Sequence, residues 1–236
     1  MASGIHGALR LPASTLNFDI GNACLGFLSG LDVVSSLIRS GAIKAGLVVA
    51  GEGSREVVES TVARLQRPDT DRAAFLSELA TLTLGSAAVA AVLVRGDLSR
   101  GGHELLGGVA LADTANNHLC QGDMAGMRTD GALLLEAGVA LAERTWAAAQ
   151  GLAWNIGQSR IFAMHQVGAT HHRAVSAALG LDLSRCPAIY PSLGNIGAAG
   201  VPVTLAAAAP GLEPGDQVAL MGIGSGLNCA MQGVRW

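Results

Sequence analysis

Apolar residues along the chain follow two recurring patterns. Short, almost uninterrupted apolar runs alternate with longer stretches in which apolar residues recur every three or four positions. The first pattern is typical of strands inside a sheet, and the second of helices with one buried face. Their alternation predicts an α/β protein with mostly parallel, helix-covered sheets.

The apolar runs place the strands. The runs at 45–50 and 86–94 are apolar throughout and predict strands that are buried on both faces. A short alternating segment at 16–20 predicts an earlier strand, and two runs around a glycine-rich turn predict a closing hairpin. The later predicted strands are 103–111, 161–167, 218–223 and 228–234.

Helical spacing is clearest after residue 24, where leucine, valine and isoleucine recur until Gly41 ends the pattern. Residues 53–81 are a more polar excursion, and 96–102 form a predicted linker. Similar Gly-Ser turns late in each half hint at an internal duplication. Further helices are predicted from 129 or 130 to 146, at 170–179 and at 195–209.

Composition narrows the class of protein. Apolar residues make up 50% of the chain and charged residues 14%, which excludes a disordered protein. The formal net charge is −3 and Lys44 is the only lysine, so we expect no nucleic-acid partner. With 32 glycines and 3% aromatic residues, the core must consist of small aliphatic side chains around glycine turns.

Membrane and disulfide-rich classes are not expected. Residues 186–212 carry no charge, but their prolines and glycines would leave backbone groups unsatisfied in lipid, so this segment is predicted to be buried interior. Residues 1–11 lack a signal-peptide pattern, which predicts a cytoplasmic protein. The four cysteines are scattered and form no C-x-x-C pair, which argues against structural zinc and a disulfide framework.

Cys24 is the first candidate for chemistry. It lies where the predicted strand 16–20 turns through Gly21 into a helix, so its sulfur is expected at the positive end of the helix dipole. That position favours the thiolate, which is the nucleophilic form. An inert buried cysteine is the alternative reading.

Three further segments carry polar groups that suit chemistry on a thioester. His165 ends a predicted strand, at an edge where α/β folds place ligands, although a packed histidine is the alternative. Asn195 stands at a helix start, where a plain N-cap is the alternative. The turn 222–226 offers bare N–H groups for an oxyanion hole, or is a simple hairpin turn.

Four ordered motifs make the chain resemble a known family. NACLGF at 22–27, HQVG at 165–168, GNIGAAG at 194–200 and GIGSGLN at 222–228 are similar to motifs of the thiolase superfamily, specifically of β-ketoacyl-ACP synthase III-like condensing enzymes. HQVG and GIGSGLN look closest to the OleA-like branch, which condenses two fatty acyl-CoA molecules head to head.

The resemblance implies a thiolase-like fold, in which two duplicated βαβαβ halves form a layered α-β-α-β-α arrangement. Residues 1–100 would be the remainder of the first half, with the nucleophile, and 101–236 the second half. Family members open with two further strands and helices, which in the olefin branch include the glutamate base. We therefore expect an incomplete, N-terminally truncated first half.

The resemblance also implies roles for individual residues. Cys24 would hold an acyl group, and its N–H would form an oxyanion hole with that of Gly224. His165 and Asn195 would bind the thioester oxygen of the second substrate while its enolate forms. The residues expected to line the substrate site beside them are Gly222, Ser225 and Gly226.

The implied substrates are acyl-CoA or acyl-ACP thioesters, with no metal or other cofactor, and the implied assembly is a homodimer joined through 16–20. His171 and His172 are expected on a solvated helix face. The cysteines expected to be packing residues are Cys120, Cys186 and Cys229.

Three alternatives to the olefin-type condensation stay open at this point. A decarboxylative 3-oxoacyl-ACP synthase III would need no strong base, because loss of CO₂ generates the enolate. The chain could also be an inactive fragment or a partner subunit. A cysteine hydrolase would use Cys24 and His165 as its catalytic pair.

Overall fold

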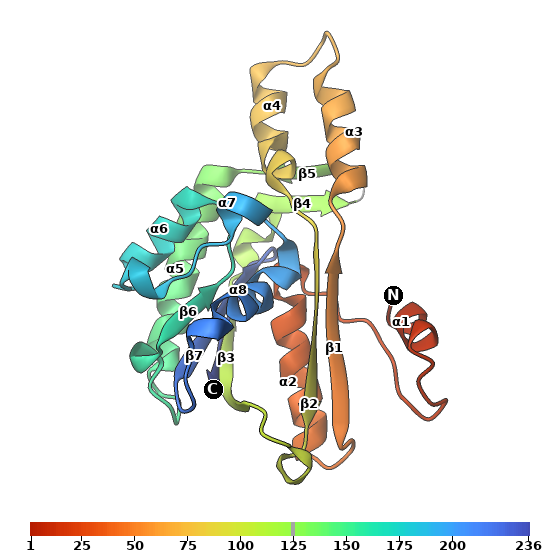
Figure 1. Cartoon of the computed structure of the whole chain (residues 1–236). Coiled ribbons are helices and arrows are strands. Elements are labelled where there is room, and N and C mark those ends of the chain that lie inside the picture. Colours follow the sequence, from red (N-terminus) through yellow and green to blue (C-terminus); the bar gives the residue numbers. More distant parts are fainter. Residues whose placement is uncertain (124–125) are drawn as a thin grey trace.

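The strands form three separate groups (Figure 1). The computed structural model describes residues 1–123 and 126–236. The strands are β1 (Ala45–Glu52), β2 (Ala87–Val94), β3 (Glu104–Ala112), β4 (Cys120–Asp123), β5 (Gly126–Thr129), β6 (Ile161–Met164), β7 (Gln217–Gly224) and β8 (Asn228–Arg235). Strands β1 and β2 pair with each other, as do β4 and β5, and a four-stranded sheet has the order β3-β8-β7-β6.

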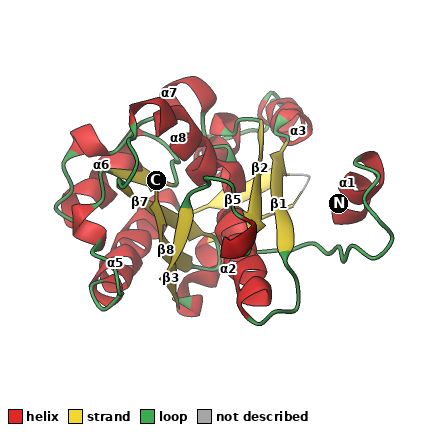
Figure 2. Ribbon diagram, turned by 60° about the horizontal axis from the view of Figure 1, so that its bottom comes forward, coloured by secondary structure: helices red, strands yellow, loops and turns green. Residues whose placement is uncertain are grey.

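Helices separate and cover these sheets (Figure 2). The α-helices are α1 (Ala2–Ala8), α2 (Gly26–Arg39), α3 (Arg55–Leu65), α4 (Arg72–Glu78), α5 (Gly131–Ala149), α6 (Ala169–Ala178), α7 (Tyr190–Leu193) and α8 (Gly200–Ala208). Helices α2 and α8 share one core cluster with β1 and with β6, β7 and β8. Helix α5 packs against β3, β8 and α6, and a second cluster fills the space between α5, α6 and the four-stranded sheet.

Close packing of α2 on β1 explains part of the glycine content. A Cβ on Gly30 would lie 2.7 Å from Cγ1 of Val48, and one on Gly46 would lie 2.5 Å from Cγ1 of Val34. Both distances are too short for real carbon atoms. The helix therefore approaches the strand at a separation that only glycine allows.

The prediction of mostly parallel sheets is wrong for the strand pairs that the structure describes. Only β6 and β7 run parallel, whereas β1–β2, β4–β5, β3–β8 and β7–β8 are antiparallel. The physical reason for β7–β8 is the short link 225–227, because a tight turn can join only antiparallel neighbours. The helix-covered α/β arrangement itself is confirmed.

The prediction that 45–50 and 86–94 are buried on both faces is also wrong. Side chains alternate along β1 and β2, so that Val48 faces α2 while the other face is exposed. On that open face Leu47 and Val49 are each 37% exposed, and Val92 is 70% exposed.

Residues 16–20 do not form the predicted strand. They run as an irregular segment in which Leu16 and Phe18 are exposed, and among the described residues no neighbouring strand supplies hydrogen bonds for their backbone. The segment is tied instead to α1, which the sequence patterns did not predict. The Asp19 carboxylate accepts hydrogen bonds of 2.8 Å from the amino terminus and from the N–H of Ala2.

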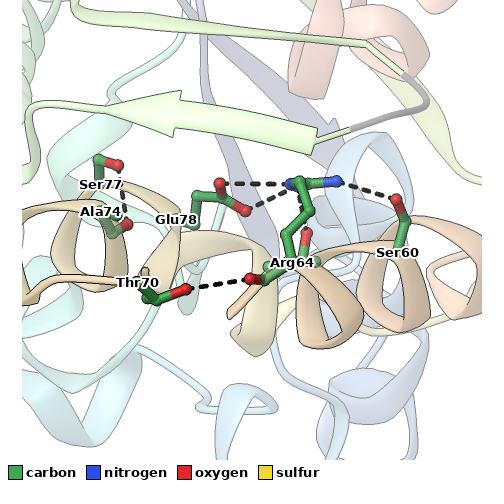
Figure 3. Close-up of polar contacts among 7 residues, drawn as sticks. Ser60, Arg64, Thr70, Ala74, Ser77 and Glu78 are labelled. Atoms are coloured by element: carbon green, nitrogen blue, oxygen red, sulfur yellow. Dashed lines mark hydrogen bonds and ion pairs between the residues drawn. The ribbon is translucent and has the colours of Figure 1, made fainter. Parts of the chain in front are cut away.

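The excursion at 53–81 contains two helices, α3 and α4, which extend beyond the ends of β1 and β2 (Figure 1). An ion pair closes this helical hairpin (Figure 3): Arg64 Nη2 lies 2.6 Å from Glu78 Oε2. Arg64 Nη1 also donates to Ser60 Oγ at 2.9 Å, and Thr70 Oγ1 donates to the Arg64 carbonyl at 3.1 Å. The hairpin is thus fixed by polar contacts on its inner side.

The remaining elements follow the predictions closely, apart from β4, β5 and α7, which were not predicted. The uncharged segment 186–212 includes α7 and α8 and places Ile196, Ala199 and Val201 in the core. The prediction of buried interior is confirmed for its central part only, because residues 191–193, 206–207 and 210–211 are exposed. Across residues 1–123 and 126–236, no helix combines the length and apolar character that crossing a bilayer requires.

Because Leu28 is buried and Leu133 is exposed, we expect their replacement by alanine to change the free energy of unfolding by very different amounts. Leu28 on α2 is 1% exposed, whereas Leu133 on α5 is 51% exposed. Leu28→Ala should lower the free energy of unfolding by about 2–5 kcal/mol, because it removes buried contacts and leaves a cavity. Leu133→Ala is the matched control, with an expected change within about 0.5 kcal/mol. Urea denaturation measures both, and equal losses for the two variants would contradict this account of the core.

Candidate active site

Cys24 lies on a strained backbone elbow. It is the middle residue of the 3₁₀ turn Ala23–Leu25, which leads directly into α2. Ala23 has a φ of +42°, a conformation that is uncommon for a residue with a side chain and costs about 1–3 kcal/mol. Cys24 as a whole residue is half-buried.

The β7–β8 hairpin supports this elbow. A Cβ on Gly224 would lie 3.4 Å from the Cys24 nitrogen and 3.2 Å from the Asn22 carbonyl oxygen, so the two backbones are in contact. Asn228 Nδ2 donates to Asn22 Oδ1 at 3.2 Å, and Asn22 Nδ2 donates to Ser29 Oγ at 2.9 Å. The structure therefore brings Gly224 next to Cys24, as an oxyanion hole built from the two N–H groups requires.

The other residues of the 222–226 turn contact different neighbours. Gly222 packs on Leu25, whose Cδ2 atom would be 2.5 Å from a Cβ on that glycine. The Ser225 hydroxyl donates to the Cys120 sulfur at 3.3 Å. Gly226 has a φ of +116°, which supplies the turn between the strands. Their roles in substrate binding stay a prediction.

His165 follows the last residue of β6, so the predicted strand 161–167 ends three residues early. Its N–H donates to the Met221 carbonyl at 2.7 Å, and its side chain is 4% exposed. The neighbouring side chain of Gln166 is saturated: its amide donates to Pro187 O and Thr204 Oγ1 and accepts from the N–H groups of Ile189 and Tyr190. This buried amide fixes the backbone that carries His165.

Asn195 is held by its backbone and by one side-chain bond. Its N–H donates to Thr83 O at 2.9 Å, and its carbonyl accepts from the N–H of Gly85 at 2.8 Å. Its Oδ1 accepts from the N–H of Gly197 at 3.1 Å. This oxygen therefore acts as a cap, as the alternative interpretation of Asn195 predicts. In the part of the chain that the structure describes, Nδ2 has no hydrogen-bond partner. That donor is free for a substrate oxygen.

The elements that carry these residues meet at one place. The turn Ala23–Leu25 contacts both β7 and the 3₁₀ turn Gly197–Ala199. A Cβ on Gly200 would lie 3.4 Å from His165 Nδ1, which puts the start of α8 beside the imidazole. A small, mainly apolar cavity adjoins it, lined by Ala142, Met164, His165, His171, Val175, Met221, Gly222, Ile223, Cys229 and Met231.

The prediction that Cys24 is a thiolate is wrong for this structure. Burial raises the pKa of its thiol to about 12, and electrostatic interactions with Glu52 and Cys120 act in the same direction. A single 3₁₀ turn supplies only part of a helix dipole, which does not offset the loss of hydration around the sulfur. Cys24 is therefore a neutral thiol at neutral pH.

The prediction that His171 and His172 lie on a solvated face is also wrong. His172 is 4% exposed, and the ring of His171 lies edge-on to that of His165 at a centroid distance of 6.3 Å. Burial, and then the neighbouring imidazole, lowers the pKa of His165 to about 3 and that of His171 to about 4. Helix α6 turns this side toward the core, because α5 covers it.

Sequence patterns missed two groups at the site. Glu52 ends β1, and its carboxylate accepts a hydrogen bond from the N–H of Ala198. Cys120 starts β4 and lies close enough to affect the Cys24 thiol, so packing does not fully describe it. Cys186 and Cys229 are buried as predicted. Within the described residues, no cluster of His, Cys, Asp or Glu could hold a metal ion.

Known proteins share this architecture. The sequence profile of 3-oxoacyl-[acyl-carrier-protein (ACP)] synthase III matches residues 18–113, and the profile of its C-terminal part matches residues 149–236. Acyl-CoA:acyl-CoA alkyltransferases of Xanthomonas campestris and Shewanella oneidensis are each 40% identical to the whole chain, which covers 70% and 71% of their lengths. Beta-ketoacyl-ACP synthase III 2 of Streptomyces coelicolor is 28% identical over 93% of the chain and 63% of its own length.

Solved structures of similar proteins have the same fold as this chain. Cerulenin-bound OleA of Xanthomonas campestris superposes with a TM-score of 0.97 at 39% identity, covering 100% of this chain and 69% of that one. A cysteine-to-serine variant of the same protein, with bound lauric acid and lauroyl-CoA, gives 0.96 at 39% identity, with coverage of 99% and 70%.

The fold is thus thiolase-like, and the relatives of the chain are acyl-transferring condensing enzymes. The chain belongs to the 3-oxoacyl-ACP synthase III family and is similar to its OleA-type members, which confirms the resemblance. The division into 1–100 and 101–236 stays a prediction, although β1–β2 and the four-stranded sheet come from the two sides of residue 100.

The raised pKa of Cys24 predicts slow alkylation of the resting protein. At pH 8 iodoacetamide should modify Cys24 about a hundredfold or more slowly than it modifies glutathione, because only the thiolate reacts. The rate should rise as the pH increases toward 10. Peptide mass spectrometry separates Cys24 from Cys120, and a Cys24 rate above that of glutathione would contradict the neutral thiol.

The two neutral imidazoles predict sensitivity to acid. Below pH 6.5 the unfolded chain binds protons at His165 and His171, which the folded protein takes up only near pH 3 and 4. Stability should therefore fall as the pH drops from 6.5 toward 4, by up to about 1.4 kcal/mol per pH unit for each histidine. Urea unfolding at pH 7 and pH 5 measures this loss.

His171→Asn should lose less stability over that interval than the unchanged protein. His118→Asn, at an exposed position, is the matched control and should keep the full loss. Identical pH dependence in all three proteins would show that the buried imidazoles do not carry the effect.

Proposed function

We propose that this enzyme condenses two acyl-CoA thioesters head to head, with Cys24 as the nucleophile. Two observations together carry the proposal: the sequence identity of the whole chain to acyl-CoA:acyl-CoA alkyltransferases, and the arrangement of the candidate active site. Identity to the two acyl-CoA:acyl-CoA alkyltransferases is 40%, against 28% for the synthase III 2 of Streptomyces coelicolor. The turn that carries Cys24 contacts β7 and the turn Gly197–Ala199, and His165 lies beside Gly200 at the end of that turn, which supports the proposal.

In the first half-reaction, the Cys24 sulfur attacks the carbonyl carbon of one acyl-CoA. The bond from that carbon to the CoA sulfur breaks, and the CoA thiol leaves with the proton of the Cys24 thiol. The N–H groups of Cys24 and Gly224 stabilise the oxyanion, a role that the close approach of the two backbones supports. One thioester replaces another, so positioning matters more than driving force.

In the second half-reaction, the second acyl-CoA loses a proton from its α-carbon to a carboxylate base, the glutamate that the resemblance to the olefin branch implies, and becomes an enolate. Asn195 Nδ2 and His165 Nε2–H donate to its oxygen, a role that suits a neutral imidazole and an unpaired amide. The α-carbon attacks the acyl carbonyl on Cys24, and the bond to sulfur breaks. The product is a β-ketoacyl-CoA.

The same chemistry defines the remaining parts of the proposal. A thiol, hydrogen-bond donors and a carboxylate base suffice for the two half-reactions, so we propose no metal and no cofactor beyond the thioesters. A cytoplasmic location fits acyl-CoA or acyl-ACP as substrates. We also propose a homodimer joined through residues 16–20, where exposed Leu16 and Phe18 need a neighbour.

Lauroyl-CoA tests the proposal directly. Intact mass should show one lauroyl group on Cys24, and chromatography should show a β-ketoacyl product. Cys24→Ala should abolish both, because no other group holds the acyl chain. Free lauric acid as the only product would indicate a hydrolase, and condensation only with a malonyl thioester would indicate the decarboxylative reaction.

Asn195→Ala should keep the lauroyl adduct but slow condensation by about 10²–10³, the usual cost of losing one such donor. Asn155→Ala is a matched control, since Asn155 Oδ1 accepts from the N–H of Gly157 at 3.0 Å in the same kind of turn, away from Cys24. The control should leave both half-reactions intact. Equal rates for the two variants would contradict the role of Asn195.

A further inference from the structure

A carboxylate lies inside the site without a part in the reaction described above. Glu52 is the last residue of β1, and its Oε1 accepts a hydrogen bond of 2.9 Å from the N–H of Ala198. The bond joins residues 146 positions apart in the chain. It connects the two-stranded β1–β2 pair to the turn that follows Asn195.

The fit between Glu52 and this turn is close. A Cβ on Gly197 would lie 2.7 Å from the carboxyl carbon and 2.8 and 2.9 Å from its two oxygens. Gly197 also has a φ of +51°, which a residue with a side chain rarely adopts. The carboxylate thus lies directly against the backbone of Gly197, where the lack of a side chain leaves room for it.

The same turn orients Asn195. The N–H of Gly197 holds Asn195 Oδ1, and the next N–H along the chain, that of Ala198, is held by Glu52. Fixing Oδ1 in this way leaves Asn195 Nδ2 as the free donor. Loss of the Glu52 bond would release Ala198 and allow the turn to rotate together with the Asn195 amide.

We propose that Glu52 is a positioning residue for the condensation step: its carboxylate clamps the Gly197–Ala198 turn and so aims the Asn195 amide at the second thioester. The inference rests on the proposed function and adds a residue to it. Glu52 acts through Asn195, so it should matter in the second half-reaction and much less in the first.

The charge of Glu52 has a separate effect that helps to test the assignment. The other titratable groups that act on the Cys24 thiol are Glu52 and Cys120, and both raise its pKa. A glutamine keeps an oxygen that can accept from Ala198 but carries no charge. Glu52→Gln therefore separates the hydrogen bond from the charge, whereas Glu52→Ala removes both.

The experiment measures lauroyl transfer to Cys24 and condensation separately. Glu52→Ala should acylate Cys24 within about threefold of the unchanged protein but condense about ten- to a hundredfold more slowly, because small misplacements of a donor are costly. Glu52→Gln should restore most of the condensation rate and make Cys24 react faster with iodoacetamide at pH 8. Glu59→Ala, at an exposed position on α3, is the control and should match the unchanged protein.

Equal losses in both half-reactions for Glu52→Ala, or a glutamine variant as slow as the alanine variant, would overturn the proposal. A crystal structure of Glu52→Ala tests it without turnover. A displaced Gly197–Ala198 turn is expected, and an unmoved turn would overturn the assignment. Absence of any adduct in the unchanged protein would instead count against the proposed function.

Discussion

The contact between the backbones of Gly224 and Cys24 holds the site together. It joins the elbow that carries Cys24, the proposed nucleophile, to the β7–β8 hairpin, which lies about two hundred residues away in the chain. Any side chain at position 224 would press on the Asn22 carbonyl and on the N–H groups of the elbow. The Asn22–Asn228 bond and the packing of Gly222 on Leu25 lie on either side of this contact. The oxyanion hole proposed here depends on it.

Burial sets the chemistry of the resting site. It keeps Cys24 as a thiol and His165 and His171 as neutral imidazoles, although each would titrate nearer to neutral pH in water. A neutral imidazole is a suitable donor to an enolate oxygen, because it gives a hydrogen bond without adding a charge that must be hydrated. The site is therefore built from dipoles and N–H groups that the fold orients before substrate arrives, the arrangement that stabilises developing charge best.

Local patterns in the sequence predicted the parts of this protein that depend on neighbours along the chain. The helix after Cys24, the strands at β1 and β2 and the closing hairpin follow from apolar spacing. Ordered motifs singled out Cys24, His165 and Asn195 as candidate site residues, and their roles stay a prediction. Glu52 could not be predicted as a site residue, because its part in the site comes from a hydrogen bond to Ala198, which lies 146 residues away in the chain. The neutral thiol, the buried His171 and His172 and the open face of β1 and β2 depend likewise on which elements cover them. The irregular path of residues 16–20 shows that a strand pattern without a partner strand does not form a strand.

The most direct test of the account is a crystal structure with a non-reactive lauroyl-CoA analogue whose thioester oxygen is retained. The account predicts that this oxygen lies about 2.7–3.1 Å from both Asn195 Nδ2 and His165 Nε2, with Asn195 Oδ1 still bound to the N–H of Gly197. An oxygen that faces away from both donors, or an Asn195 amide turned toward the core, would contradict it.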